Sequence, residues 1–290
     1  MEEREPPLPE VTLPSGADWP ALGLGTWQMG EDASREAREL GALRLAFEIG
    51  YRVIDTAEMY GDGGAEALLG EALRGATHEG LSREDLFIVS KVYPHNAGVD
   101  GMLAACERSL RRLQLDRIDL YLLHWRGEVP LAETVQGFET LQRRGWIRHW
   151  GVSNFDLDDL RELDAVPGGA ACSANQVYYS LSERGVEFEL LPWQRLRQMP
   201  LMAYSPLDQG ALADHPSLRA VAERHAATPT QVALAWMLRH PGVMAIPKAA
   251  QALHLRHNWA AARLQLDDDD VATLDRLFPP PVRKRPLAMR

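Results

Sequence analysis

Four side chains with complementary acid–base chemistry stand at or just after the ends of three short apolar runs. Asp55, Lys91 and His124 each close one run, and Tyr60 follows Asp55 by five residues. If these runs are neighbouring parallel strands of a barrel, their carboxyl ends bring a carboxylate, a phenol, an amine and an imidazole to one face. The placement of four such groups at matched strand ends predicts an active site there.

These four side-chain types suit the reduction of a carbonyl group. A carbonyl oxygen needs a proton when its carbon accepts hydride, and the Tyr60 phenol can donate that proton in an apolar pocket. A free phenol has a pKa of about 10, and the ammonium group of Lys91 beside it lowers that pKa. Asp55 supplies the counter-charge that a buried lysine requires. His124 hydrogen-bonds the carbonyl oxygen and stabilises the charge that develops on it.

Each residue also has a purely structural explanation when it is taken alone. Asp55 can cap a turn, Tyr60 can pack in its loop, Lys91 can lie on the surface, and His124 can be a hydrogen-bonded core histidine. Their joint placement at strand ends favours the catalytic interpretation.

Eight short apolar runs separated by helical segments would position these residues. The runs are continuous rather than alternating, as is typical of parallel strands covered on both faces. They span residues 22–25, 51–55, 86–90, 118–123, 147–152, 174–178, 201–204 and 243–246, and helices are expected at 34–49, 101–113, 131–144 and from Thr228-Pro229 onward. This alternation predicts an α/β protein with a (β/α)₈ TIM barrel. Residues 8–20 are expected to form an N-terminal β-hairpin that closes the barrel floor.

A doubly wound open sheet would show the same alternation of strands and helices, but it should carry a glycine-rich dinucleotide fingerprint. Gly23 and Gly25 match the first two glycines of that motif, and Gln28 stands where the third belongs. The glycine run at 61–64 also departs from the motif, because Glu66 stands at the position of the third glycine. We interpret both runs as turns at the rim of a barrel.

The composition favours a soluble cytoplasmic enzyme. The chain has 290 residues, 46% hydrophobic and 25% charged, and is expected to form a single domain over residues 1–290. Cys106 and Cys172 are expected to be buried thiols of a reducing compartment. A net charge of −10 disfavours nucleic acid and membrane partners, and no targeting or membrane-spanning segment is recognised. We expect a monomer whose tail at 279–290, including basic Arg290, is frayed and without function.

Several motifs resemble those of the aldo-keto reductase superfamily and occur in the family's order between residues 22 and 278. They are Asp55–Gly61, Val89–Lys91, Leu122–Trp125, Gly151–Phe155, Asn175-Gln176, Tyr204–Leu207 and Ile246–Lys248. The runs 29–34 and 90–98 are similar to those of bacterial methylglyoxal-reducing members. The resemblance implies NADPH-dependent reduction of small aldehydes and α-ketoaldehydes, with Asp55, Tyr60, Lys91 and His124 as the catalytic tetrad.

The resemblance also implies where NADPH binds. Ser153, Asn154 and Gln176 would hold the carboxamide, and Tyr204 would stack on the nicotinamide ring. The pyrophosphate and the rest of the cofactor would contact Gly25, Thr26, Trp27, Ser205, Pro206, Leu207, Gln209, Ile246, Pro247 and Lys248. Core packing for Tyr204 and a helix cap for Ser153 and Asn154 are the structural alternatives.

The expected adenosine site departs from the family pattern. Ala249 replaces a usual hydroxyl residue, His254 stands where an arginine for the 2′-phosphate is expected, and His257 replaces a residue that is often acidic, while Asn258 keeps the adenine-contacting amide. Lys248 offers a charge without an arginine's bidentate fork. A modest preference for NADPH is therefore expected, with NADH use possible. His254 and His257 lack further ligands for a metal site, so no metal is expected.

Trp27, Met59, Tyr93 and Trp125 adjoin these motifs and are expected to wall an apolar substrate pocket. Two other functions stay open at this point. One is a cofactor-binding regulatory subunit of the same fold with little turnover, and the other is a metal-dependent barrel hydrolase. The intact tetrad favours the reductase.

Overall fold

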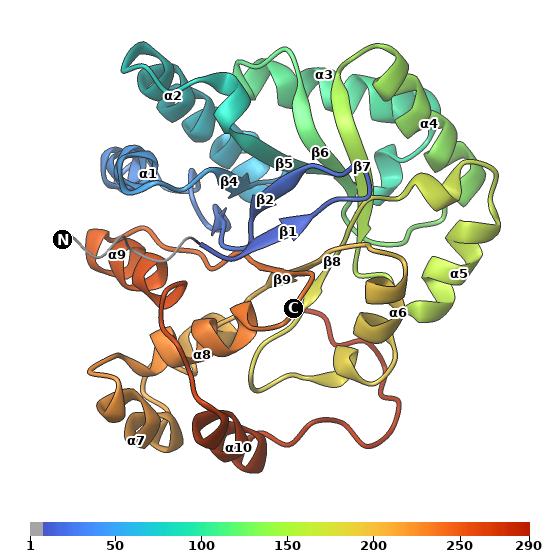
Figure 1. Ribbon diagram of the computed structural model, residues 1–290. Coiled ribbons are helices and arrows are strands. Elements are labelled where there is room, and N and C mark those ends of the chain that lie inside the picture. The colour runs from blue at the N-terminus through green and yellow to red at the C-terminus, as the bar shows by residue number, and fades with distance from the viewer. Residues whose placement is uncertain (1–7) are drawn as a thin grey trace.

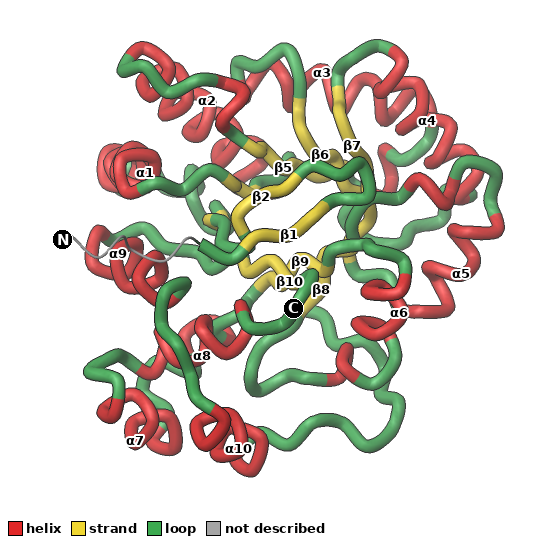
Figure 2. Tube along the Cα trace, viewed as in Figure 1, coloured by secondary structure: helices red, strands yellow, loops and turns green. Residues whose placement is uncertain are grey.

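The computed structural model describes residues 8–290, and its centre is one parallel sheet of eight strands (Figures 1 and 2). The strands follow one another around the sheet in chain order from β3 to β10. They are β3 Leu24–Gly25, β4 Val53–Asp55, β5 Phe87–Val92, β6 Ile118–Leu123, β7 Ile147–Ser153, β8 Asn175–Tyr178, β9 Leu201–Tyr204 and β10 Val243–Ala245. Each of the eight strands lies within or overlaps one predicted apolar run.

Backbone hydrogen bonds close this sheet into a barrel. The N–H of Gly23 donates to the carbonyl of Ala245 (2.9 Å), and the N–H of Gly25 donates to the carbonyl of Pro247 (3.1 Å). These bonds join β3 to β10, so the sheet has no free edge. The (β/α)₈ barrel is confirmed, and the doubly wound alternative is excluded.

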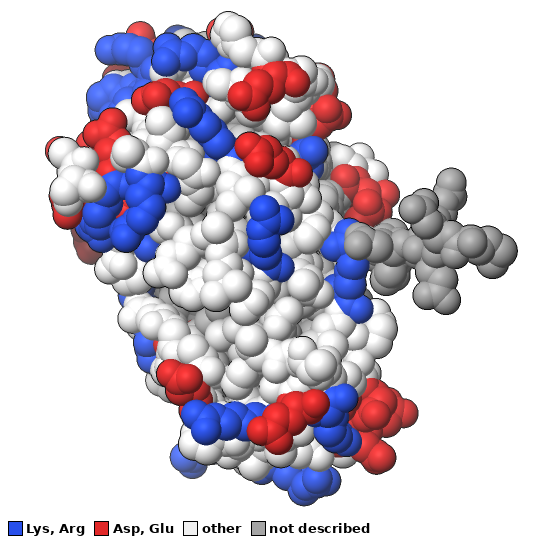
Figure 3. All heavy atoms as spheres, turned by 90° about the vertical axis from the view of Figure 1, so that its left-hand side faces the viewer, with Lys and Arg blue, Asp and Glu red and all other residues white. Residues whose placement is uncertain are grey.

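Helices surround the barrel, as Figures 1 and 2 show. They are α1 Glu36–Ile49, α2 Gly64–His78, α3 Val99–Leu113, α4 Leu131–Arg143, α5 Leu157–Ala165, α6 Leu190–Leu196, α7 Pro216–Arg224, α8 Pro229–Leu238, α9 Ala252–Ala261 and α10 Asp268–Leu277. Helix α8 begins as expected, with Pro229 in its first turn and Thr228 as the N-cap residue of a capping box with Gln231. Figure 3 shows basic and acidic side chains interspersed on the face that carries α1, α2 and α9.

The N-terminal hairpin covers one end of the barrel. Strands β1 Glu10–Thr12 and β2 Asp18–Pro20 pair antiparallel. Trp19 of this hairpin packs on Phe87 at the start of β5, with ring centroids 4.7 Å apart, and Val11 is buried. The hairpin therefore closes the floor at the amino ends of the strands and leaves the carboxyl ends for the functional residues.

Two expectations about the rest of the chain can be compared with the structure. Cys106 and Cys172 are free and buried, as predicted. In residues 8–290, every helix is too short or too polar to cross a membrane. The expectation that no targeting segment is present concerns residues 1–10, of which residues 1–7 lie outside the described part.

The expectation of a frayed C-terminal tail, residues 279–290, was wrong. Lys284 in this tail forms ion pairs with Asp158 (3.0 Å) and Glu189 (2.7 Å), and Arg290 forms one with Asp208 (2.6 Å). Lys284 and Arg290 thus find acidic partners on the barrel, which the pattern of a short charged run does not reveal.

A close backbone contact holds the loop that carries Tyr60. Gly64 lies so close to Gly30 that a Cβ atom on Gly64 would stand 2.2 Å from the Gly30 carbonyl oxygen. Gly61 and Gly63 in the same loop adopt positive φ angles of 59° and 88°. The glycine run therefore serves a tight turn and a close approach, in agreement with its interpretation as a rim turn.

We predict that Gly64→Ala lowers the free energy of unfolding by about 1–3 kcal/mol, because the added methyl group forces the two loops apart. The matched control is Gly41→Ala within α1, where a Cβ meets no atom within 4 Å. That change should raise stability by about 0.5–1 kcal/mol. Urea unfolding curves measure both effects, and equal stabilities for the two variants would contradict the contact.

Candidate active site

Lys91 is the centre of a hydrogen-bonded cluster at the carboxyl ends of β4 and β5. Its Nζ donates to Asp55 Oδ2 (2.8 Å), to the Thr56 carbonyl (2.8 Å) and to the Tyr60 hydroxyl (3.1 Å). The Lys91 side chain is fully buried and Asp55 nearly so. All three ammonium protons therefore have partners, which is the condition under which a charge can be buried.

The barrel geometry brings these residues together. Strands β4 and β5 run parallel with Asp55 opposite Val89, so Lys91 lies two residues further along and its side chain reaches back to Asp55. Tyr60 lies in the short helix Tyr60–Gly63 that follows β4. His124 follows the end of β6, and its ring packs edge-on against Tyr60 with centroids 5.9 Å apart. The four predicted residues therefore meet at one site.

Burial dominates the electrostatics of Tyr60. Burial raises the pKa of Tyr60 above its usual value, and the negative charge of Asp55 adds to this, while the charge and hydrogen bond of Lys91 lower it. The expected effect of Lys91 on the pKa is present, but it is smaller than the effect of burial. Tyr60 thus keeps its proton at neutral pH, as a proton donor must before it acts.

His124 is neutral in the fold. Burial and the nearby charge of Lys91 lower the pKa of His124 to about 2. Among the described residues, its Nδ1 has no hydrogen-bond partner. A neutral imidazole can donate a hydrogen bond to a carbonyl oxygen through an N–H, but it cannot serve as the acid at neutral pH.

The residues expected at the nicotinamide end lie close to this cluster. Gln176 Nε2 donates to Asp55 Oδ1 (2.8 Å), and Asn154 Nδ2 donates to the His124 carbonyl (3.2 Å) and to Ser153 Oγ (3.2 Å). The Tyr204 hydroxyl donates to Asn154 Oδ1 (2.9 Å). Two side-chain amides, a hydroxyl and an aromatic ring therefore gather around the tetrad.

The loop after β9 has an unusual backbone. Ser205 and Gln209 have positive φ angles of 48° and 52°, as does Asp208 (52°), and none of them is glycine. Non-glycine residues in the left-handed region cost free energy and cluster at ligand-binding loops. Pro206 is buried in this loop, and Leu207 packs against the core.

The expected adenosine residues lie beside the seam that closes the barrel. Gly25 pairs with Lys248 across the seam, and the hydroxyl of Thr26 donates to the Asp55 carbonyl (3.0 Å). Lys248 lies at the surface, and the loss of water around its ammonium group is the main cause that lowers its pKa. Ile246, Pro247 and Ala249 are buried around it, and α9 carries exposed His254, half-buried His257 and buried Asn258.

The expected pocket wall lies next to the tetrad at His124. The rings of Tyr93 and Trp125 meet edge-on with centroids 5.9 Å apart, and Trp125 also adjoins His124 at 4.9 Å. Trp27 is 38% exposed, which is high for so large an apolar side chain, and Met59 is half-buried. Of the four expected wall residues, the fold thus brings Tyr93 and Trp125 into contact beside the tetrad.

Sequence reasoning missed three residues that organise this site. Glu58 is buried and accepts hydrogen bonds from the Tyr93 N–H (2.8 Å) and from Asn96 (3.3 Å), so it joins the loop carrying Tyr60 to the pocket wall. Asp208 and Arg290 form an ion pair beside Tyr178, whose ring stacks on that of Tyr204. Glu58 could have been found from its place inside the motif at 55–61, whereas the sequence contains no signal for Arg290.

The fold and the site together define a (β/α)₈-barrel enzyme with an acid–base cluster at the carboxyl ends of its strands. The model of the aldo/keto reductase family matches residues 21–278, and the chain belongs to this family. It is 50% identical to methylglyoxal reductase YeaE of Escherichia coli over 275 residues, which are 93% of this chain and 95% of that protein. It is 36% identical to glyoxal reductase of Bacillus subtilis, with 92% of each chain covered.

A solved structure is similar over nearly the entire chain. The aldo/keto reductase of Klebsiella pneumoniae, determined in complex with NADP and acetate, superposes with a TM-score of 0.93 at 48% identity. The match covers 98% of this chain and 100% of the Klebsiella chain.

The low pKa of His124 makes a prediction about stability and pH. An unfolded histidine has a pKa of about 6.5. Below that pH, the histidine therefore binds a proton in the unfolded chain but stays neutral in the folded protein. The stability due to neutral His124 is therefore complete above about pH 6.5 and falls by about 1.4 kcal/mol per pH unit below it. We expect the unfolding free energy of the wild type, minus that of His124→Gln, to decrease as the pH falls from 8 to 5. A difference independent of pH would contradict a neutral His124.

Proposed function

We propose that this enzyme reduces small aldehydes and α-ketoaldehydes, methylglyoxal among them, to alcohols with NADPH as the hydride donor. The observation that carries the proposal is the position of the buried Lys91 ammonium, which contacts both the Tyr60 hydroxyl and the Asp55 carboxylate. Relatives named methylglyoxal reductase and glyoxal reductase support the substrate class. The NADP held by the Klebsiella enzyme in its crystal structure supports the cofactor.

The residues at the site fit a nicotinamide cofactor. The amides of Asn154 and Gln176 and the hydroxyl of Ser153 match a carboxamide, which both donates and accepts hydrogen bonds. The Tyr204 ring offers an aromatic face to the nicotinamide. Lys248 offers a positive charge to a phosphate group. The left-handed backbone at Ser205 and Gln209 is also typical of a ligand-binding loop.

The chain's own residues handle the proton of the reaction. When bound, the reduced nicotinamide supplies a hydride to the carbonyl carbon. Tyr60 gives its hydroxyl proton to the carbonyl oxygen, so the substrate gains H⁻ and H⁺ and leaves as an alcohol. Lys91 stabilises the phenolate of Tyr60 until solvent returns the proton. Asp55 holds Lys91 in place, and neutral His124 donates a hydrogen bond that orients the carbonyl oxygen.

Large apolar and aromatic side chains are expected to exclude water from the substrate. Trp27, Met59, Tyr93 and Trp125 would form the apolar wall, which strengthens the electrostatic contacts of the reacting oxygen. No observation on residues 8–290 favours the regulatory-subunit alternative, and those residues contain no cluster of three or more potential metal ligands for a hydrolase.

We expect Tyr60→Phe to lower kcat for methylglyoxal by a factor of about 100 or more, because general acid catalysis contributes about 10²–10⁴-fold. The affinity for NADPH should change little, since the removed hydroxyl contacts Lys91 rather than the amide residues. Steady-state assays of NADPH oxidation and titration of protein fluorescence measure the two quantities. Turnover retained within threefold would refute Tyr60 as the proton donor.

Cofactor selection should depend on the residue at position 254. Wild type should prefer NADPH only modestly, because Lys248 provides a charge without an arginine fork. His254→Arg should raise the ratio of kcat/KM for NADPH over NADH by about tenfold, the effect of one added charge-assisted hydrogen bond. Leu253→Arg adds the same charge at the adjacent exposed position of α9, outside the expected cofactor residues, and should leave the ratio unchanged. A clear preference of the wild type for NADH would contradict the proposed modest preference for NADPH.

A further inference from the structure

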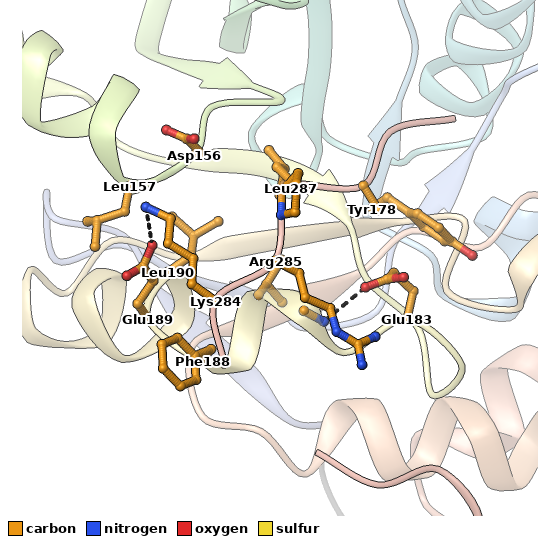
Figure 4. Close-up of a pocket in the computed structure, with 14 residues that line it drawn as sticks. Asp156, Leu157, Tyr178, Glu183, Phe188, Glu189, Leu190, Lys284, Arg285 and Leu287 are labelled. Carbon is orange, nitrogen blue, oxygen red and sulfur yellow. Dashed lines mark hydrogen bonds and ion pairs between the residues drawn. The ribbon is translucent and has the colours of Figure 1, made fainter. Parts of the chain in front are cut away.

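The C-terminal tail is fastened to the barrel rim at two separate points. Near its start, Lys284 bridges Asp158 in α5 and Glu189 just before α6. Leu287 then lies between these anchors and Tyr178, in a narrow cavity also lined by Leu157 and Leu190 (Figure 4). At its far end, Arg290 reaches the ends of β8 and β9.

Arg290 contacts two stacked tyrosines. Tyr178 and Tyr204 are paired across β8 and β9, and their rings stack with centroids 5.9 Å apart and planes at 23°. The Arg290 guanidinium lies 5.0 Å from the Tyr178 ring centroid, within the range of a cation–π interaction. The Arg290 side chain therefore contacts Tyr178, and Tyr178 stacks on Tyr204, whose hydroxyl contacts Asn154.

Arg290 also fixes the Tyr204 hydroxyl. The backbone N–H of Arg290 donates to that hydroxyl (3.2 Å), which in turn donates to Asn154 Oδ1 (2.9 Å). This second bond leaves the Asn154 Nδ2 group to donate to the His124 carbonyl. The orientation of the Asn154 amide, and so the side it can offer to a carboxamide, depends on the chain of contacts that begins at Arg290.

Asp208 connects Arg290 to the strained loop after β9. Its carboxylate accepts hydrogen bonds from the Tyr178 hydroxyl (2.7 Å) and from Ser182 (2.9 Å), and it pairs with the Arg290 guanidinium (2.6 Å). Without Arg290, this carboxylate would keep two hydrogen bonds and lose its counter-charge. The ion pair thus holds the β9 loop and the tyrosine stack in one arrangement.

We propose that Arg290 is a positioning residue for the cofactor, which holds Tyr204 and Asn154 as a preformed platform for the nicotinamide ring and its carboxamide. The inference rests on the proposed function, because it assumes that Tyr204 and Asn154 meet the nicotinamide. Arg290 acts through Tyr178, Tyr204 and Asp208, and its charge is already paired with a carboxylate. A preformed platform binds the ring without the entropic cost of ordering two side chains.

The test compares three variants in NADPH binding. Arg290→Ala should raise both the Kd and the dissociation rate of NADPH by about tenfold, as expected when a cation–π contact and an ion pair that order the platform are removed. Arg290→Lys should recover part of the loss, since an ammonium can still pair with Asp208. Arg283→Ala removes the same charge from an exposed position of the same tail and should have no effect. Stopped-flow fluorescence measures dissociation.

A second ligand separates positioning from direct contact with phosphate. Adenosine 2′-monophosphate carries the 2′-phosphate of NADPH but neither the pyrophosphate nor the nicotinamide, so Arg290→Ala should leave its Kd unchanged. Loss of affinity for both ligands, or unchanged or tighter NADPH binding by Arg290→Ala, would overturn the proposal. Failure of the wild type itself to bind NADPH or to reduce methylglyoxal would instead refute the proposed function.

Discussion

The buried charge of Lys91 is the constraint on which the rest of the site depends. Moving an ammonium group out of water costs several kcal/mol unless an opposite charge and hydrogen bonds replace the water. Here a carboxylate, a backbone carbonyl and a phenol replace it, and they come from the end of β4 and the loop that follows it, while Lys91 lies on β5. A displacement of β4 relative to β5 would leave the Lys91 charge without partners. The site therefore forms only when these two strands pair in the correct register.

The charge of Lys91 acts on the protonation of both Tyr60 and His124. The charge of Lys91 favours the phenolate of Tyr60 and so makes proton loss easier, although burial outweighs it in the resting enzyme. The same charge, together with burial, keeps His124 from accepting a proton. In the proposed reaction the phenol is thus the acid and the imidazole a neutral hydrogen-bond donor, and this division follows mainly from burial, with the Lys91 charge acting on both groups.

The sequence predicted the barrel and the meeting of the tetrad because both depend on local patterns. Parallel strands appear in the sequence as continuous apolar runs. The end of each run shows which residues lie at the carboxyl end of that strand. The net pKa of Tyr60 could not be predicted, because burial is a property of the whole fold. The docking of Arg290 could not be predicted either, since its partner Asp208 lies 82 positions earlier in an irregular loop.

The chemistry and the proposed cofactor binding are supported by different kinds of structure. Asp55, Lys91 and His124 stand on or directly after strands, where backbone hydrogen bonds on both sides fix their positions. The amide of Asn154 instead follows a strand end with a φ of 60°, and its orientation depends on the Tyr204 hydroxyl. Side chains at such positions are held only by their neighbours. A tail residue that fixes this hydroxyl can therefore alter binding at the nicotinamide end while Lys91 keeps all three of its partners.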